Sequence, residues 1–238
     1  MYSKRARIGV IAPLDDKVEY AFNKYAPEGV SFDSTRLSFP GPTPEGLIYL
    51  ADQLEDAAKM YAKKPHDVVL FGCTSGSCIK GVGWDKECIR TIERACGWPG
   101  LTTSTAVLEA FQALGLNKTV VMTPYPEETN EAEKKFLEDN GIQVTSITGI
   151  GFNRMKTLGG ESNPTKMFLY RNAKKLKTEG AEVFFLSCMG LPTMELVQIL
   201  EDDLGIPVIT SHQASLWACL RHSRVNDKLP NLGKLFTI

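Results

Sequence analysis

The stretch Val68-Val-Leu-Phe-Gly-Cys73-Thr-Ser-Gly76 and its counterpart Val183-Phe-Phe-Leu-Ser-Cys188-Met-Gly190 decide how this chain folds. Each begins with four apolar residues, rich in β-branched and aromatic side chains, which predict a buried strand. Small or hydroxyl-bearing residues surround the cysteine in both, as is typical of a strand-to-helix turn. The two cysteines lie 115 positions apart, so the sequence predicts one thiol at a strand end in each half of the chain.

Strands and helices alternate from end to end, which predicts an α/β fold built on parallel sheets. We expect strands at residues 8–12, 31–37, 68–71, 100–103, 118–123, 143–148, 183–186 and 208–210. We expect helices at residues 18–25, 45–63, 85–96, from 105 onward, and at 127–140, 164–178, 194–204 and 214–221.

The two halves also match in detail. Pro13 and Pro124 each follow the first strand of a half, and the segments 97–104 and 205–212 share one pattern. These matches predict two similar Rossmann-like lobes related by a pseudo-twofold axis. The first lobe would comprise residues 1–112 and 213–238, and the second residues 113–212. Ligands of open α/β sheets bind beyond the carboxyl ends of the strands, so we expect the active site in the crevice between the lobes.

Composition excludes several classes of function. The formal net charge of −1 gives no electrostatic reason to expect nucleic acid or an anionic membrane as partner. No run approaches the roughly 18 apolar residues of a membrane span, and the N-terminus lacks a signal peptide's apolar region. We therefore expect a soluble, cytoplasmic protein. A homodimer is the default expectation for such a protein.

The remaining motifs predict neither a metal nor a cofactor. Six cysteines in a chain without an export signal are expected to stay reduced. The histidines have no metal-ligand spacing, and no G-x-G-x-x-G follows a strand. Four cysteines are expected to pack as small apolar side chains: Cys78, Cys88, Cys96 and Cys219.

The paired cysteines suit proton transfer at a carbon beside a carboxylate. Such a carbon is hard to deprotonate because the enediolate intermediate concentrates negative charge, so a base and hydrogen-bond donors are both required. A racemase needs a thiolate on one face of the carbon and a thiol on the other, and twofold-related cysteines supply both. The expected donors are Thr74, Ser75 and Ser77 beside Cys73, and Met189, Gly190 and Thr193 beside Cys188. The alternative is that both cysteines are buried packing residues.

The motifs Gly-Cys73-Thr-Ser and Leu-Ser-Cys188-Met-Gly resemble the twin cysteine motifs of the aspartate/glutamate racemase superfamily. Within it, the chain is most similar to maleate cis–trans isomerases and arylmalonate decarboxylases, nearly end to end. Four further segments carry the resemblance to this branch: Ser34-Thr-Arg36, Pro44-Glu-Gly-Leu47, Thr103-Ser-Thr-Ala106 and Thr123-Pro-Tyr125.

The resemblance implies roles for individual residues. In the isomerases, the cysteine matching Cys73 adds to the double bond of a cis-diacid, the adduct rotates, and the cysteine matching Cys188 assists proton transfer. The residues matching Tyr125 and Asn153 bind substrate carboxylate. Arylmalonate decarboxylases keep the second cysteine as proton donor but have glycine in place of the first. They hold the enediolate with residues that resemble Thr74, Ser75 and Tyr125.

One loop departs from the isomerase pattern. The chain reads Pro13-Leu-Asp15-Asp16 where the isomerases usually have asparagine near Asp16. An ionised aspartate would repel a dicarboxylate but could bind a substrate with a positive group; alternatively, the acidic pair caps a solvated helix. We expect a cofactor-independent isomerase or racemase of a small carboxylic acid that uses both cysteines. The alternatives are a decarboxylase that uses Cys188 alone and a non-catalytic binding protein for a small acid.

Overall fold

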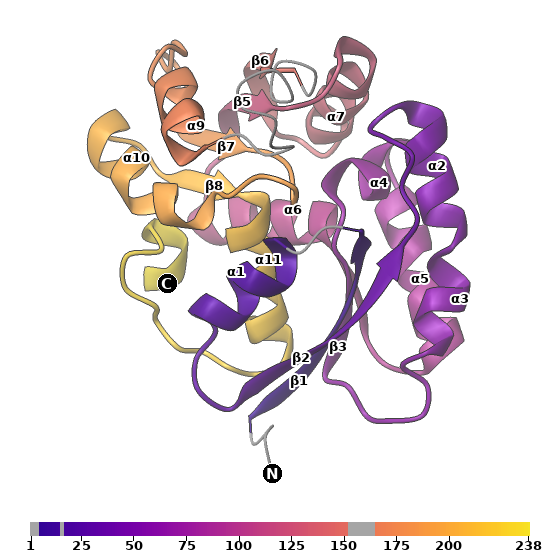
Figure 1. Cartoon of the computed structure of the whole chain (residues 1–238). Coiled ribbons are helices and arrows are strands. Elements are labelled where there is room, and N and C mark those ends of the chain that lie inside the picture. Colours follow the sequence, from indigo (N-terminus) through magenta and orange to yellow (C-terminus); the bar gives the residue numbers. More distant parts are fainter. Residues whose placement is uncertain (1–4, 15–16, 152–164) are drawn as a thin grey trace.

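The computed structural model describes residues 5–14, 17–151 and 165–238. Two four-stranded parallel sheets organise these residues (Figure 1). The first sheet has the order β2-β1-β3-β4, with β1 Ala6–Pro13, β2 Val30–Leu37, β3 Val68–Phe71 and β4 Gly100–Thr102. The second has the order β6-β5-β7-β8, with β5 Lys118–Thr123, β6 Gln143–Gly149, β7 Val183–Leu186 and β8 Val208–Thr210. The prediction of two similar α/β lobes is confirmed.

Each cysteine-bearing strand occupies the same place in its sheet. β3 pairs with β1 and β4, while β7 pairs with β5 and β8. All four residues of β3 and all four of β7 are buried, as expected for parallel strands covered on both faces. The apolar runs that precede Cys73 and Cys188 therefore form equivalent interior strands.

Helices cover both faces of each sheet. The first half has α1 Lys17–Tyr25, α2 Pro44–Asp52, α3 Leu54–Lys59, α4 Thr74–Cys78, α5 Trp84–Cys96 and α6 Thr103–Leu114. The second half has α7 Glu127–Asp139, α9 Lys166–Ala173, the 3₁₀ turn η1 Met194–Leu196, α10 Val197–Leu204 and α11 Ser211–His222, and a last 3₁₀ turn, η2, spans Lys234–Thr237.

Two expected helices differ from the observed ones. The helix expected at 45–63 is divided into α2 and α3 at Gln53, whose side-chain amide donates to the Ser38 carbonyl and whose side-chain oxygen accepts from the Ser38 amide. This tie to the end of β2 competes with a regular helical turn. The helix expected at 164–178 is shorter, because α9 ends at Ala173.

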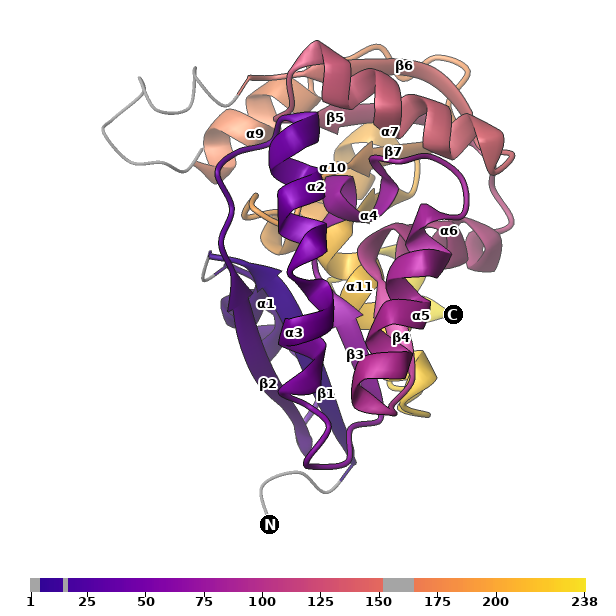
Figure 2. The ribbon, with the colours of Figure 1, turned by 90° about the vertical axis from the view of Figure 1, so that its right-hand side faces the viewer.

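The helices α6 and α11 lie between the two sheets and join the lobes (Figures 1 and 2). Each begins at once after an edge strand, and the threonine that ends the strand caps the helix: Thr102 accepts from the Thr105 amide and Thr210 from the Gln213 amide. One apolar core runs through α6, α11 and the inner faces of both sheets. Because both helices contact both lobes, the lobe boundaries at residues 112 and 212 stay a prediction.

The outer face of each sheet has a separate apolar core. The helices α2, α3 and α5 cover the first sheet, and α9 and α10 cover the second. None of the helices in the described part of the chain is long and apolar enough to cross a membrane.

Candidate active site

Cys73 lies at the junction of β3 and α4 and caps that short helix. Its Sγ accepts a hydrogen bond from the Gly76 amide at 3.3 Å. A Cβ at Gly76 would lie 3.0 Å from this sulfur and 3.2 Å from the Phe71 ring, so a larger residue there would crowd the thiol. The predicted strand-to-helix turn is confirmed, with a helix of a single turn where a loop was expected.

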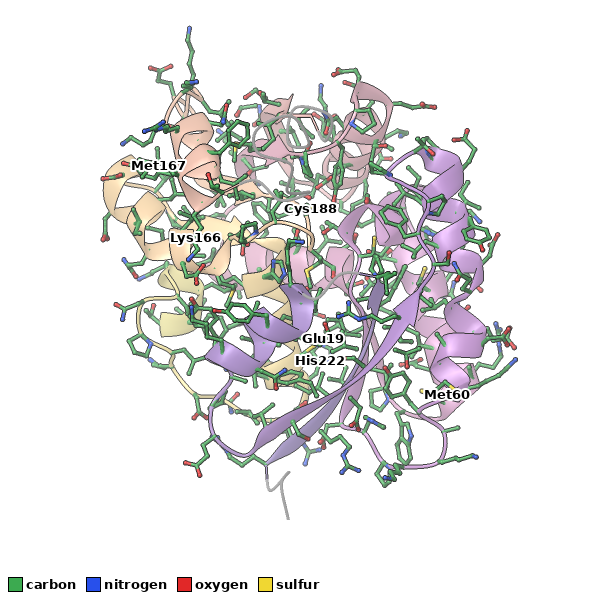
Figure 3. All side chains as sticks on the ribbon, viewed as in Figure 1. Glu19, Met60, Lys166, Met167, Cys188 and His222 are labelled. Atoms are coloured by element: carbon green, nitrogen blue, oxygen red, sulfur yellow. The ribbon has the colours of Figure 1, made fainter. Side chains whose placement is uncertain are left out.

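Cys188 follows β7 with a strained backbone. Its φ is +142°, a region that favours glycine. Two hydrogen bonds hold it: the Cys188 amide donates to Ser211 Oγ at 2.9 Å, and Cys188 Sγ accepts from the Gly190 amide at 3.2 Å. Figure 3 places Cys188 near the middle of the molecule, between the two lobes. The two hydrogen bonds hold the loop and its thiol in this conformation.

The Ser211 hydroxyl joins the two cysteine loops. It accepts from the Cys188 amide and also from the Thr74 hydroxyl, at 2.8 Å, although Thr74 and Ser211 are 137 residues apart. Ser211 is fully buried and begins α11. The sequence analysis missed Ser211 as a site residue. Its match to Thr103, which begins α6 in the other half, is the sequence feature that could have identified it.

Tyr125 lies close to both thiols. Burial raises the pKa of Tyr125 well above its usual value, and the charges of Cys188, Glu133 and Cys73 raise it further, as does a hydrogen bond with Cys188. The phenol therefore keeps its proton and can donate it. The structure thus brings Tyr125 together with the two predicted catalytic cysteines in one buried space.

The pKa of Cys73 is raised to about 11, mainly by burial. Hydrogen bonds from the Gly76 amide and the Ser75 side chain favour the thiolate, while the negative charge of Glu133 opposes it. A helix of one turn contributes little dipole, so burial dominates. The enzyme hypotheses expect at least one activated thiol, and Cys73 does not have a lowered pKa.

The predicted donors lie around these groups. Thr74 and Ser75 are buried and form the first turn of α4, where backbone N–H groups have no partner within a helix. The Met189 side chain is directed toward α11, because its sulfur accepts from the Ser215 hydroxyl at 3.8 Å. Gly190 contributes its amide to the Cys188 thiol. Two predicted site residues, Asp16 and Asn153, lie outside the described residues.

Glu133 is a second residue that the sequence analysis missed. It is buried in α7, three residues after the buried Asn130 and four before the buried Leu137. This helical spacing places it on the inward face, and from this spacing its burial could have been predicted from the sequence. It lies at the cysteine site, because α7 packs against α4, the helix that Cys73 caps, and the charge of Glu133 raises the pKa of Cys73 and Tyr125.

Other charged or polar candidates belong elsewhere. Arg36 forms an ion pair with Glu19 and donates to the Pro13 carbonyl at 2.9 Å, so it has a structural role. A pocket lies between α1 and the segment 191–195, with His212 on its wall, and neither Cys73 nor Cys188 lines it. Within the described ranges, no group of three His, Cys, Asp or Glu side chains is arranged to hold a metal ion.

The fold and the site define a class of protein: two-lobed α/β proteins in which each lobe contributes one cysteine to a shared, buried polar site. The family model of arylmalonate decarboxylase matches residues 8–236, and the chain belongs to this family. The branch predicted from the cysteine motifs is thereby confirmed.

The relatives include two kinds of enzyme. Arylmalonate decarboxylase from Bordetella bronchiseptica is 27% identical over 230 residues, which cover 96% of this chain and 95% of that protein. Maleate isomerase from Geobacillus stearothermophilus is 21% identical over 250 residues, which cover 99% and 98% of the two chains.

Solved structures of both enzymes match the whole fold. Maleate isomerase from Pseudomonas putida superposes with a TM-score of 0.88 at 20% identity, covering 97% of this chain and 98% of that one. A liganded double mutant of arylmalonate decarboxylase, with a glycine changed to cysteine and a cysteine to serine, gives a TM-score of 0.85 at 27% identity and the same coverage.

Proposed function

We propose that the protein is a cofactor-independent isomerase or racemase of a small carboxylic acid, with Cys73 and Cys188 as its catalytic pair. The observation that carries this proposal is that one cysteine from each lobe and Tyr125 share a buried site, where Ser211 ties the two cysteine loops together. The maleate isomerases among the relatives support it. One of their structures, from Nocardia farcinica, contains a covalently bound succinylcysteine intermediate.

On a cis-diacid such as maleate, the Cys73 thiolate would add to one carbon of the double bond. The carbon–sulfur bond forms as the π electrons move to the neighbouring carbon and its carboxylate, giving an enediolate. The Cys188 thiol then protonates that carbon. Rotation about the new single bond follows, Cys188 takes the proton back, and the carbon–sulfur bond breaks to release the trans-diacid and the Cys73 thiolate.

The same pair can racemise an α-carbon. One cysteine, as the thiolate, removes the proton from one face, and the other, as the thiol, donates a proton to the opposite face. In both reactions Tyr125, Thr74 and Ser75 would stabilise the enediolate, because donors in a buried site act at low dielectric. Carboxylate binding by Asn153, a role for Asp16, a homodimer and a cytoplasmic location stay predictions.

A second candidate is the decarboxylation of a substituted malonate. It is favoured by the family model and by the 27% identity to arylmalonate decarboxylase. In that reaction Cys188 alone protonates the enediolate left by loss of CO₂, and Cys73 has no chemical step. The presence of Cys73, where the decarboxylases are expected to have glycine, favours the two-cysteine reaction.

The test is incubation in D₂O with maleate, both enantiomers of aspartate and glutamate, and phenylmalonate, followed by proton NMR. We expect fumarate or α-deuteration with the wild type and with the control Cys96→Ser, because Cys96 contacts Trp98 before the start of β4, whereas Cys73 follows the carboxyl end of β3. Cys73→Ser and Cys188→Ser should each abolish it. CO₂ loss from phenylmalonate that survives Cys73→Ser would establish the decarboxylase instead. Binding without turnover would establish the non-catalytic binding protein.

A further inference from the structure

Glu133 is an ionisable group that the proposed reaction does not use. Its side chain is buried, with the residue 1% exposed, and neither carboxyl oxygen has a hydrogen-bond partner of normal geometry within the described residues. No lysine, arginine or histidine in that part of the chain forms an ion pair with it. An isolated buried carboxylate is costly, since nothing replaces the water it loses.

The surroundings of Glu133 are the cysteine site. α7 packs against α4, the helix that Cys73 caps (Figure 2). The carboxylate raises the pKa of Cys73 and Cys78 on that side, and of Tyr125, which precedes α7. The Ser187 hydroxyl, next to Cys188, is the polar group that favours the charged form of Glu133, although it makes no hydrogen bond of normal geometry. In the described part of the chain, the groups whose pKa Glu133 raises, Cys73, Cys78 and Tyr125, are all acids themselves.

Burial raises the pKa of Glu133 to about 7. The carboxyl therefore changes charge near neutral pH, beside a thiol whose ionisation the proposed reaction requires. Packing alone gives no reason for an acid here, because an amide or a leucine of similar volume would fill the space without a buried charge.

We propose that Glu133 is a positioning residue that acts through Cys73: in its protonated form it permits the Cys73 thiolate, and in its ionised form it opposes that thiolate. The inference rests on the proposed use of Cys73 as a nucleophile or base. A negative charge on either Glu133 or the thiol then makes a second charge in the site harder to form. Mutual repulsion of two acids in one buried site has this effect.

The test measures thiol ionisation without substrate, so its result does not depend on whether the proposed function is correct. The Cys73 thiolate is followed by its ultraviolet absorbance, as the difference between each protein and the same protein with Cys73→Ser. At a pH of about 9, Glu133→Gln should contain about ten times more Cys73 thiolate than the wild type, which corresponds to a pKa lower by about one unit. Glu131→Gln, an exposed position on the same helix, is the matched control and should leave the titration unchanged.

Glu133→Leu removes the charge by a different substitution and should shift the titration equally, so poor folding of the glutamine variant does not end the test. A third measurement uses the wild type alone and follows the rate of Cys73 alkylation, quantified on its peptide by mass spectrometry. This rate increases with pH as the thiolate forms, and the increase should become less steep between about pH 6 and 8, where Glu133 ionises. Superimposable titrations in the wild type and the folded Glu133 variants would overturn the inference. An equal shift in Glu131→Gln would overturn it too.

Discussion

The burial of Glu133 predicts a stability that depends on pH in a particular way. Its pKa is raised from 4.5 to about 7 on folding. Between these values the folded protein binds more protons at this site than the unfolded chain. The contribution of Glu133 to the free energy of unfolding is therefore most favourable below about pH 4.5 and is lost as the pH rises through about 7. At about 1.4 kcal/mol per pH unit, the interval corresponds to a loss of about 3 kcal/mol in the free energy of unfolding.

Glu133→Gln removes this titration while it keeps the shape of the side chain. At pH 5 the variant and the wild type should differ little, because both have a neutral group in the same place. At pH 8 the variant should be more stable than the wild type by up to about 3 kcal/mol.

The assay is urea unfolding followed by circular dichroism at both pH values, with linear extrapolation to water. The informative quantity is the change with pH in the difference between variant and wild type, since the titration of all other carboxylates cancels in it. Glu131→Gln on the exposed face of α7 is the control and should show no such change. A variant-minus-wild-type difference that is the same at pH 5 and pH 8 would refute the reasoning.

Three further predictions concern other parts of the molecule. Tyr125→Phe should reduce kcat by about 10- to 100-fold, because a buried donor to the enediolate is lost, while a circular dichroism spectrum checks that the fold is kept. Ser211→Ala should lower the free energy of unfolding by about 1–3 kcal/mol, measured with urea, since two buried donors lose their acceptor. The hydrogen bond with Glu109 raises the pKa of His222. The pair's small, screened contribution to the free energy of unfolding should therefore be fully present below about pH 6.5 and disappear above the raised pKa. His222→Gln should remove that component from thermal unfolding curves measured across pH.

The strand ends and their cysteines could be predicted because the signal is local. Four apolar residues followed by a cysteine and small residues mark β3 and β7 without any knowledge of the rest of the chain. The duplication then placed Cys73 and Cys188 at equivalent positions of two sheets. The division of the helix expected at 45–63 could not be predicted in this way, since it depends on a contact between Gln53 and Ser38 at the end of another element.

The residues that the sequence analysis missed act through contacts between distant segments. Ser211 matters because two loops, 137 and 23 residues away along the chain, come to its hydroxyl. Glu133 has the helical spacing of a buried residue, but a glutamate at such a position is normally expected at the solvent-exposed edge of the buried face. Only the packing of α7 against α4 shows that its carboxyl lies beside the thiols, without a hydrogen-bond partner among the described residues.

The two cysteines occupy equivalent places but have different surroundings, and the proposed chemistry requires that difference. Cys73 caps a helix with an ordinary φ of −144°, and Glu133 opposes its ionisation only while that carboxyl is charged, so the proposed Cys73 thiolate requires the protonated form of Glu133. Cys188 has a φ of +142° and a hydrogen bond with Tyr125. A reaction that adds one sulfur to carbon and uses the other to carry a proton needs a thiolate and a thiol at the same moment. A perfectly symmetric site would give both cysteines the same pKa and no reason to divide these roles. The duplication therefore supplies the pair, while Glu133, Tyr125 and the strained Cys188 backbone make its members unequal.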